Sequence, residues 1–186
     1  IIIVTDTDQK EKTIESKNTI IATGSLPVSL PGVEFDEKHI LSSTGALSLS
    51  NVPNKMIIVG GGYIGLEMGS VWSRLGTDVQ VIEFLDHITP GMDKEISKEF
   101  QKLLQKQGIN FNLKTKVDSI SKNNDRVIVK TTDDKGNKKQ FDSDVVLISV
   151  GRKPNTSNLN LNKIGIEKDQ KGRIKVNKYF QTNTKN

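Results

Sequence analysis

The sequence predicts an α/β fold whose centre is a parallel β-sheet. Three observations lead to this prediction. A short apolar run at residues 56–59 leads directly into Gly60-Gly-Gly62, and apolar residues at helical spacing follow the glycines. A second strand-like run occupies residues 78–83. A third run, residues 145–150, is continuously apolar, as is typical of an interior parallel strand.

The glycine-rich turn carries a G-x-G-x-x-G pattern between a predicted strand and a predicted helix, the context that gives the pattern meaning. Gly60 permits a sharp turn, Gly62 lets a pyrophosphate approach the backbone, and Gly65 lets the helix pack close to the strand. The positive end of the helix then faces the phosphates. The predicted helix has its apolar residues at Ile64, Met68, Val71, Trp72 and Leu75, and it ends at Gly76.

Glu83 ends the second strand, about 20 residues after the glycine turn, where dinucleotide-binding folds carry an acidic residue. A carboxylate at this place accepts hydrogen bonds from the adenosine ribose hydroxyls and repels a 2′-phosphate. The sequence therefore predicts a Rossmann-like site that binds NAD in preference to NADP, rather than a glycine turn without a ligand.

The residues before this segment predict less regular structure. Residues 1–5 and 12–15 form a predicted hairpin around a polar turn, and residues 19–22 form a short strand. Residues 26–53 are rich in proline and serine, which is a linker composition, with one short turn at 42–46. A chain that begins inside a strand without an initiator methionine is typical of a fragment of a longer protein.

After Glu83 the pattern departs from simple alternation of strands and helices. Asp93 can cap a helix that ends at Gly108 and is followed by a half-buried strand at 109–113. The predicted buried stripe of that helix consists of Ile96, Phe100, Leu103 and Leu104. Three polar-rich strands then predict a β-meander in place of a crossover helix, at 117–121, 126–132 and 138–141. Beyond the strand at 145–150 we expect loops anchored by Leu159, Leu161, Ile164 and Ile166, with a small strand at 173–176.

Composition argues against several classes of function. The formal charge of +5 comes from lysines scattered among acids, which argues against nucleic-acid binding. No apolar run is long enough to span a bilayer, so no membrane partner is expected. The absence of cysteine excludes disulfides, thiolate metal sites and cysteine redox chemistry within these residues.

The remaining candidate ligands point to no metal. His39 and His87 lack a matching carboxylate partner, and we interpret them as surface histidines. Asp133 and Asp134 fit a hairpin turn, since no glutamate follows at calcium-loop spacing. We therefore predict no metal site.

Several stretches together resemble the pyridine nucleotide-disulfide oxidoreductase family, and within it the dihydrolipoyl dehydrogenase branch. They follow the family's order and cover nearly the whole chain. The matching stretches are 20–25 (IIATGS), 41–47 (LSSTGAL), 60–69 (GGGYIGLEMG), 81–85 (VIEFL), 90–93 (PGMD), 151–155 (GRKPN) and 173–176 (RIKV).

The resemblance implies an FAD domain interrupted by an NAD domain. Residues 1–45 would be a partial FAD-domain segment with a linker, 46–151 the NAD-binding domain, and 152–186 the returning FAD-domain segment. Thr23 and Gly24 match positions that touch FAD. The matching NAD positions are Gly60, Gly61, Gly62, Tyr63, Ile64, Gly65 and Glu67 in the cradle, Glu83 at the ribose, and Val117 and Gly151 as further contacts. Tyr63 also matches the residue that covers the flavin in glutathione reductase-like relatives, and a packing aromatic is the alternative.

The implied function is to position nicotinamide to accept hydride from reduced FAD during oxidation of dihydrolipoamide. The redox-active cysteine pair and the His-Glu base pair of the family lie outside these residues, so this fragment alone is expected to contain no catalytic residue and to be inactive. The resemblance further implies FAD, a homodimer and lipoyl-domain partners for the full-length protein, in the bacterial cytoplasm or the mitochondrial matrix. Two alternatives stay open: another NADH-dependent flavin disulfide or peroxide reductase, and a non-catalytic NAD-binding redox-sensing module.

Overall fold

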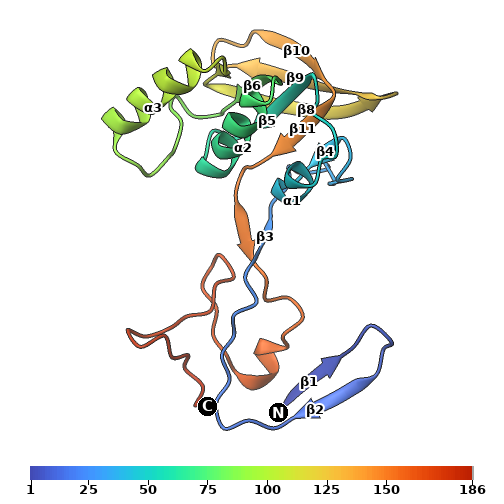
Figure 1. Cartoon of the computed structure of the whole chain (residues 1–186). Coiled ribbons are helices and arrows are strands. Elements are labelled where there is room, and N and C mark those ends of the chain that lie inside the picture. The colour runs from blue at the N-terminus through green and yellow to red at the C-terminus, as the bar shows by residue number, and fades with distance from the viewer. Residues whose placement is uncertain (186) are drawn as a thin grey trace. The chain divides into compact units, whose positions relative to one another are not determined.

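The computed structural model describes residues 1–185 and divides into two compact units (Figure 1). One unit is the continuous segment Pro27–Arg152. The other combines Ile1–Leu26 with the residues from Lys153 onward. The prediction drew the first boundary at residues 45 and 46, whereas the contacts group residues 27–45 with the parallel sheet.

A five-stranded parallel sheet in the order β4-β11-β5-β6-β7 lies at the centre of the larger unit. Its strands are β4 (Ile40–Leu41), β5 (Lys55–Val59), β6 (Asp78–Ile82), β7 (Asn110–Asn112) and β11 (Val145–Ile148). All four residues of β11 are buried, because both faces of an interior parallel strand are covered. The predicted α/β fold with a parallel sheet is confirmed.

Alternate side chains of each strand enter two separate apolar clusters. Met56 and Ile58 of β5 belong to the cluster on the helical face, whereas Ile57 and Val59 belong to the cluster under the meander. The helices are α1 (Ser43–Leu47), α2 (Tyr63–Arg74) and α3 (Lys94–Lys106). The meander consists of β8 (Thr115–Asn123), β9 (Arg126–Asp133) and β10 (Lys138–Ser143) in the order β10-β9-β8. The predicted meander, which replaces a crossover helix, is therefore confirmed.

The segment predicted to be a linker contributes to the sheet. Ile40 and Leu41 are buried in the edge strand β4 and pair with β11. Ser42 then caps α1, since its hydroxyl oxygen accepts a hydrogen bond from the amide of Thr44. A two-residue strand and a five-residue helix are too short to give a periodic signal, and the prediction of a linker there was wrong.

The amino-terminal hairpin is confirmed, with β1 (Ile2–Thr5) paired to β2 (Glu11–Ile14). No strand forms at residues 19–22, and the prediction there was wrong. The strand lies just beyond, where β3 (Ser25–Pro27) pairs with β12 (Arg152–Pro154). At residues 173–176 only an isolated bridge between Lys168 and Ile174 forms, instead of the predicted strand.

Helix α3 is capped as predicted but presents a different face to the sheet. Asp93 accepts hydrogen bonds from the amides of Glu95 and Ile96. Leu104 is buried, whereas Ile96 and Leu103 are 58% and 62% exposed, so half of the predicted stripe was wrong. Ser97 faces the core instead, because its hydroxyl lies 2.8 Å from that of Thr89, which gives a buried polar group a partner.

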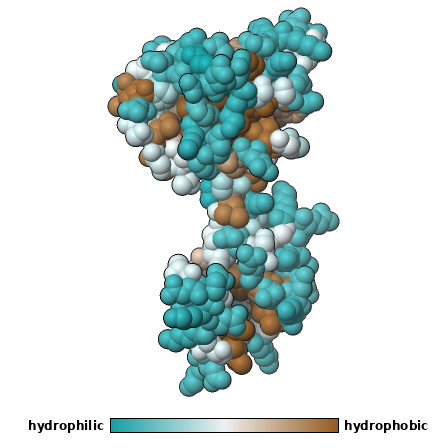
Figure 2. Space-filling view, turned by 90° about the vertical axis from the view of Figure 1, so that its right-hand side faces the viewer, coloured by the Kyte–Doolittle hydropathy of each residue, from teal (hydrophilic) through white to brown (hydrophobic). Residues whose placement is uncertain are grey.

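The smaller unit has little core of its own. Among its described residues, the buried hydrophobic side chains are Leu161, in the short 3₁₀ helix η1 (Leu161–Ile164), and Ile166. The predicted anchor Ile164 is 55% exposed. Figure 2 shows hydrophobic groups interrupting the hydrophilic surface of this unit and of the larger one. Among the described residues, none of the helices has the length and apolar character that a bilayer crossing requires.

Candidate dinucleotide-binding site

A cleft of about 840 Å³ lies at the carboxyl ends of β5, β6 and β11. It is lined by the glycine turn after β5, by the residues that follow β6 and β11, and by the first residues of β8. The chain leaves β5 toward β6 on one side, while β11 lies on the other side. This is a topological switch point, the place where open α/β sheets bind ligands.

Gly60, Gly62 and Gly65 differ in the structural reason for which glycine is needed at each position. Gly60 has a φ of +107°, and a Cβ there would lie 2.7 Å from the carbonyl oxygen of Ser149. A Cβ at Gly65 would lie 2.4 Å from the hydroxyl oxygen of Ser149, so this glycine lets α2 pack against the end of β5. Gly62 has a φ of −76°, which any residue adopts, and a Cβ there would meet no atom within 4 Å. Packing therefore explains Gly60 and Gly65, and Gly62 leaves its space open to the cleft.

Helix α2 presents an uncapped amino terminus to this cleft. Gly62 is its N-cap residue and offers no side chain to the first turn. Gly62, Tyr63 and Ile64 all line the cleft. The orphan N–H groups of the first turn and the positive end of the helix dipole favour an anion at this place.

Glu83 is buried at the edge of the cleft, with only 8% of its surface exposed. One carboxylate oxygen accepts a hydrogen bond of 2.5 Å from the amide of Gly61, and the other accepts one of 2.7 Å from the amide of Leu85. Two backbone donors therefore fix the orientation of the carboxylate. A carboxylate has about four acceptor positions, and the two backbone N–H groups use two of them. Glu83 can therefore still accept hydrogen bonds from ligand hydroxyls.

Seven of the predicted site residues line the cleft, and the others lie outside its lining. The cleft is lined by Gly60, Gly62, Tyr63, Ile64, Glu83, Val117 and Gly151. Gly61 and Gly65 lie buried behind the cleft, and Glu67 is exposed farther along α2. Thr23 and Gly24 belong to the smaller unit, where the Thr23 hydroxyl donates to the carbonyl of Asn155 and the Asn155 amide donates to that of Gly24.

Other cleft residues were missed by sequence reasoning. Phe84 and Leu85 directly follow Glu83, and Lys116 precedes Val117. Their position beside predicted site residues was the available signal. Ser149 was read as part of a continuous apolar strand, but β11 ends at Ile148, which leaves Ser149 free to turn toward the glycines.

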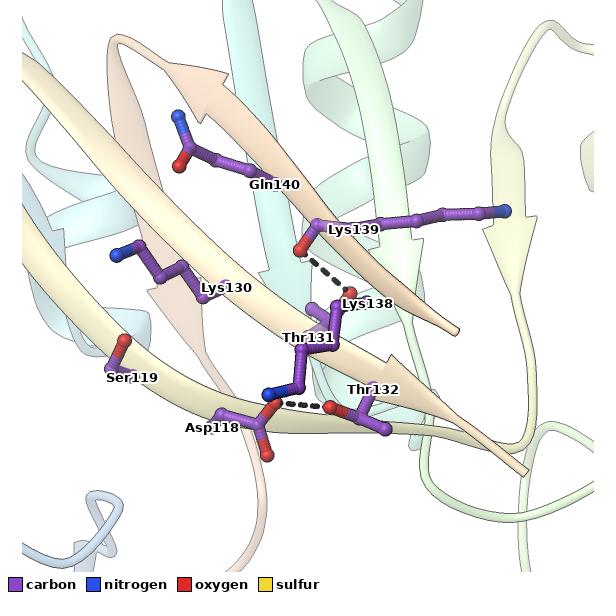
Figure 3. Close-up of a pocket in the computed structure, with 8 residues that line it drawn as sticks. All are labelled: Asp118, Ser119, Lys130, Thr131, Thr132, Lys138, Lys139 and Gln140. Atoms are coloured by element: carbon purple, nitrogen blue, oxygen red, sulfur yellow. Dashed lines mark hydrogen bonds between the residues drawn. The ribbon is translucent and has the colours of Figure 1, made fainter. Parts of the chain in front are cut away.

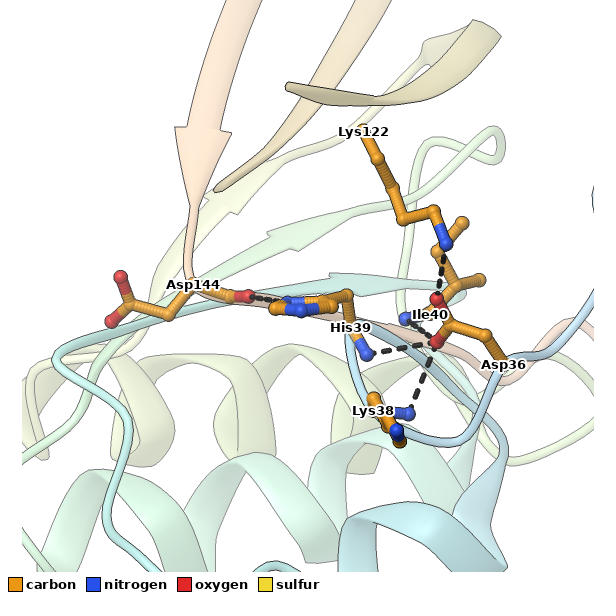
Figure 4. Close-up of polar contacts among 6 residues, drawn as sticks. All are labelled: Asp36, Lys38, His39, Ile40, Lys122 and Asp144. Carbon is orange, nitrogen blue, oxygen red and sulfur yellow. Dashed lines mark hydrogen bonds and ion pairs between the residues drawn. The ribbon is translucent and has the colours of Figure 1, made fainter. Parts of the chain in front are cut away.

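One wall of the cleft comes from the segment between β3 and β4, through Leu30 and Pro31. Hydrogen bonds to Asp36 hold this segment in place, as Figure 4 shows. Its carboxylate accepts hydrogen bonds from Lys122 on β8 and from the backbone N–H groups of Lys38, His39 and Ile40. Burial raises the pKa of Asp36, but these hydrogen bonds outweigh it and hold the pKa well below its ordinary value of 3.8.

The histidines lie outside the cleft lining. His39 Nδ1 lies 3.3 Å from the carbonyl oxygen of Asp144. His87 does have a carboxylate neighbour, contrary to the prediction, because Asp86 Oδ1 lies 2.6 Å from its Nδ1. That hydrogen bond lowers the pKa of Asp86. Among residues 1–185 no group of three potential metal ligands comes together.

A second hollow of about 460 Å³ lies on the meander (Figure 3). Its lining includes Lys130, Lys138 and Asp118, and the Asp118 carboxylate accepts a hydrogen bond from the Thr132 hydroxyl. It contains none of the predicted site residues and no helix terminus. The cleft at the strand ends is therefore the candidate site.

Comparison with known proteins decides the family. The model of the pyridine nucleotide-disulphide oxidoreductase family matches residues 1–186. The chain belongs to this family. The predicted membership is thus confirmed, and the parallel sheet described above is the one expected for a pyridine nucleotide-disulphide oxidoreductase.

Two curated proteins are similar to this chain over most of its length. Mitochondrial dihydrolipoyl dehydrogenase of Pisum sativum is 53% identical over 183 residues, which cover 97% of this chain and 36% of that protein. Leghemoglobin reductase of Glycine max is 52% identical over 183 residues, which cover 97% of this chain and 35% of that protein. The chain therefore spans about a third of the length of these relatives.

A solved structure of the same fold is LpdA from Mycobacterium tuberculosis. It superposes with a TM-score of 0.87 at 25% sequence identity, covering 98% of this chain and 39% of that one. Nearly every residue of this chain thus has a structural counterpart within a longer protein.

Proposed function

We propose that this chain is the NAD-binding part of a dihydrolipoyl dehydrogenase and that its cleft holds the dinucleotide. One observation carries the proposal: the uncapped amino terminus of α2 and the fixed carboxylate of Glu83 open onto the same cleft at the topological switch point. The 53% identity to a dihydrolipoyl dehydrogenase supports this assignment. When bound, NAD supplies the hydride acceptor and the FAD of the full-length protein supplies the donor, during oxidation of dihydrolipoamide.

The pyrophosphate would lie against the start of α2. Gly62, Tyr63 and Ile64 line this cleft at the start of the helix, and the open space beside Gly62 would let phosphate oxygens reach the backbone N–H groups. The Gly61 N–H is already used by Glu83. The phosphates would therefore be held by residues 62–64 rather than by the whole glycine run.

The adenosine ribose would lie against Glu83. Its two backbone hydrogen bonds hold the carboxylate in place before a ligand arrives, so little conformational freedom is lost on binding. The hydroxyls of an NAD ribose would donate to the remaining acceptor positions. A 2′-phosphate would instead meet the buried carboxylate of Glu83, so we expect a preference for NAD over NADP.

The nicotinamide would lie toward Gly151, which follows β11 on the opposite side of β5 from β6 and Glu83. Val117 lies near the start of β8, where the Thr115 N–H donates to the carbonyl of Glu83, so Val117 would contact the adenosine end. In this proposal Tyr63 and Glu67 on α2 contact the nicotinamide end. These residues orient and enclose the reacting ring, and orientation is the contribution that a protein makes when cofactors carry the redox chemistry.

The smaller unit would be part of the FAD-binding domain, with Thr23 and Gly24 contacting FAD. Its exposed apolar side chains support this, since Ile1, Ile20 and Phe180 are each at least 85% exposed. A small, weakly cored unit of this kind gains its stability from further residues that cover it. Ile1–Leu26 and the residues from Lys153 onward would then be completed by the remainder of a longer protein.

The full-length protein would act as a homodimer and exchange electrons with lipoyl domains of 2-oxo acid dehydrogenase complexes. The mitochondrial relative favours the matrix over the bacterial cytoplasm as its location. The nearly equal identity to a leghemoglobin reductase supports a second candidate, a flavin reductase that passes electrons to another acceptor. Both candidates use the same NAD cleft, and a non-catalytic NAD-binding module would use it too.

Titration of the 186-residue chain with NADH and NADPH tests the proposal. We expect saturable NADH binding, at least tenfold weaker NADPH binding, and no lipoamide-dependent reduction of NAD⁺. Equal affinity for the two nucleotides would refute the role of Glu83. Turnover of lipoamide by this chain would refute the assignment of the catalytic groups to other parts of the protein.

A further inference from the structure

The peptide unit that joins Gly60 to Gly61 is held from both sides. Its carbonyl oxygen lies 3.2 Å from the hydroxyl oxygen of Ser149. Its N–H donates the 2.5 Å hydrogen bond to Glu83. Because a peptide unit is planar, these two contacts at opposite edges restrict its rotation. We call this arrangement the peptide clamp.

The two side chains of the peptide clamp come from different strands. Glu83 follows β6 and Ser149 follows β11, and these strands flank β5 on either side. The Ser149 amide also donates to the carbonyl of Val59 at 2.8 Å. The glycine turn is therefore tied to both neighbouring strands of the sheet.

The Ser149 hydroxyl occupies space that Gly65 leaves free. A Cβ at Gly65 would lie 2.4 Å from this hydroxyl oxygen. The hydroxyl also lies 3.2 Å from the carbonyl oxygen of Val59, so it can donate to either of two carbonyl groups at the end of β5. It thus lies between the end of β5 and the first turn of α2.

We propose that Ser149 is a positioning residue for the dinucleotide: through the peptide clamp it fixes the N–H groups of residues 62–64 for the pyrophosphate and keeps Glu83 oriented toward the ribose. This inference rests on the proposed function, because it concerns the same cleft. Ser149 would act on the glycine turn that holds the dinucleotide, not on the dinucleotide itself. Loss of the hydroxyl frees the Gly60 carbonyl and loosens the peptide that carries the Gly61 N–H.

Replacing Ser149→Ala in the 186-residue chain tests this role against a matched control. Ser143→Ala also removes a serine hydroxyl, but Ser143 is buried at the end of β10, and its hydroxyl has no hydrogen-bond partner among the described residues. We expect Ser149→Ala to weaken NADH binding about three- to tenfold, the size of one hydrogen bond, and Ser143→Ala to leave it unchanged. The thermal unfolding midpoints of both variants show whether weaker NADH binding comes from a change in the glycine turn or from general destabilisation of the fold.

Amide hydrogen exchange at Gly61 gives a second readout that general destabilisation does not produce. In the absence of nucleotide, we expect Ser149→Ala to accelerate exchange of the Gly61 amide about three- to tenfold, with amides of β9 unchanged. Unchanged Gly61 exchange, or NADH binding equal to that of Ser143→Ala, would overturn the role of Ser149 alone. Failure of the unaltered chain to bind NADH would overturn the proposed function and this role with it.

Discussion

The carboxylate of Glu83 lies 2.5 Å from the amide nitrogen of Gly61 and links the end of β6 to the glycine turn after β5. The residue that is proposed to hold the ribose therefore also shapes the backbone beside the proposed pyrophosphate site. Changes at Glu83 are expected to affect the turn as well as the ligand.

Glu83→Gln tests this dual role. The amide group of glutamine places an NH₂ against one of the two backbone donors, Gly61 or Leu85, so one hydrogen bond is lost inside a buried site. We expect a loss of about 1–3 kcal/mol in the free energy of unfolding and at least tenfold weaker NADH binding. Glu67→Gln on the exposed face of α2 is the control for stability, with a change within about 0.5 kcal/mol. Equal destabilisation by the two variants, measured by urea unfolding, would contradict the account.

Two glycine variants separate the effect of the ligand from that of packing. Gly62→Ala has space and a permissive φ, so we expect unchanged stability but weaker NADH binding as its Cβ enters the cleft. Gly65→Ala would place a Cβ 2.4 Å from the Ser149 hydroxyl oxygen and 2.6 Å from the Gly60 carbonyl oxygen. We expect it to lose about 1–3 kcal/mol of stability. If Gly62→Ala binds NADH as the unaltered chain does, the phosphates do not lie at that place.

The hydrogen bonds to the Asp36 carboxylate predict that the stability of the fold depends on pH. The pKa of Asp36 is lower in the folded chain than its ordinary value of 3.8. The ionised carboxylate therefore contributes its full stabilisation of the fold above pH 3.8, and this stabilisation is lost as the pH falls toward the pKa of the folded chain. Asp36→Asn is expected to cost about 1–2 kcal/mol at pH 7. Urea unfolding should show that the difference in unfolding free energy between the unaltered chain and Asp36→Asn becomes smaller below pH 4. A difference that is the same at pH 7 and pH 3 would rule out the ionised carboxylate as its source.

The orientation of α3 can be tested by paired truncations. Leu104 of α3 is only 3% exposed, so Leu104→Ala is expected to cost about 2–5 kcal/mol in the free energy of unfolding. Ile96 is 58% exposed, so Ile96→Ala is expected to cost less than about 0.5 kcal/mol. A large loss on truncating Ile96 would favour the buried stripe that the sequence pattern predicts.

The elements that were predictable from sequence are those with a strong local cause. The apolar run of β5, its glycine turn and the periodic helix α2 follow from residues that are adjacent in the chain. The cap at Asp93 and the turns of the meander also depend on neighbours in sequence. For the same reason Glu83 could be predicted as a site residue from its place at the end of β6.

What could not be predicted depends on contacts distant in sequence. Strand β4 is stabilised by pairing with β11, about a hundred residues later in the chain. Ser97, rather than Ile96, faces the core because Thr89 supplies a hydroxyl partner. Ser149 reaches the Gly60 carbonyl only once β11 lies beside β5. No local pattern carries these three relationships.

Backbone amide NMR of the labelled chain during titration with NADH tests the central claim most directly. We expect the largest shifts at residues 60–64, 83–85 and 149–151, which border the cleft at the strand ends. We also expect small shifts at Lys130 and Lys138, which line the hollow on the meander. Shifts confined to the meander, or none at saturating NADH, would contradict the claim that this cleft binds the dinucleotide.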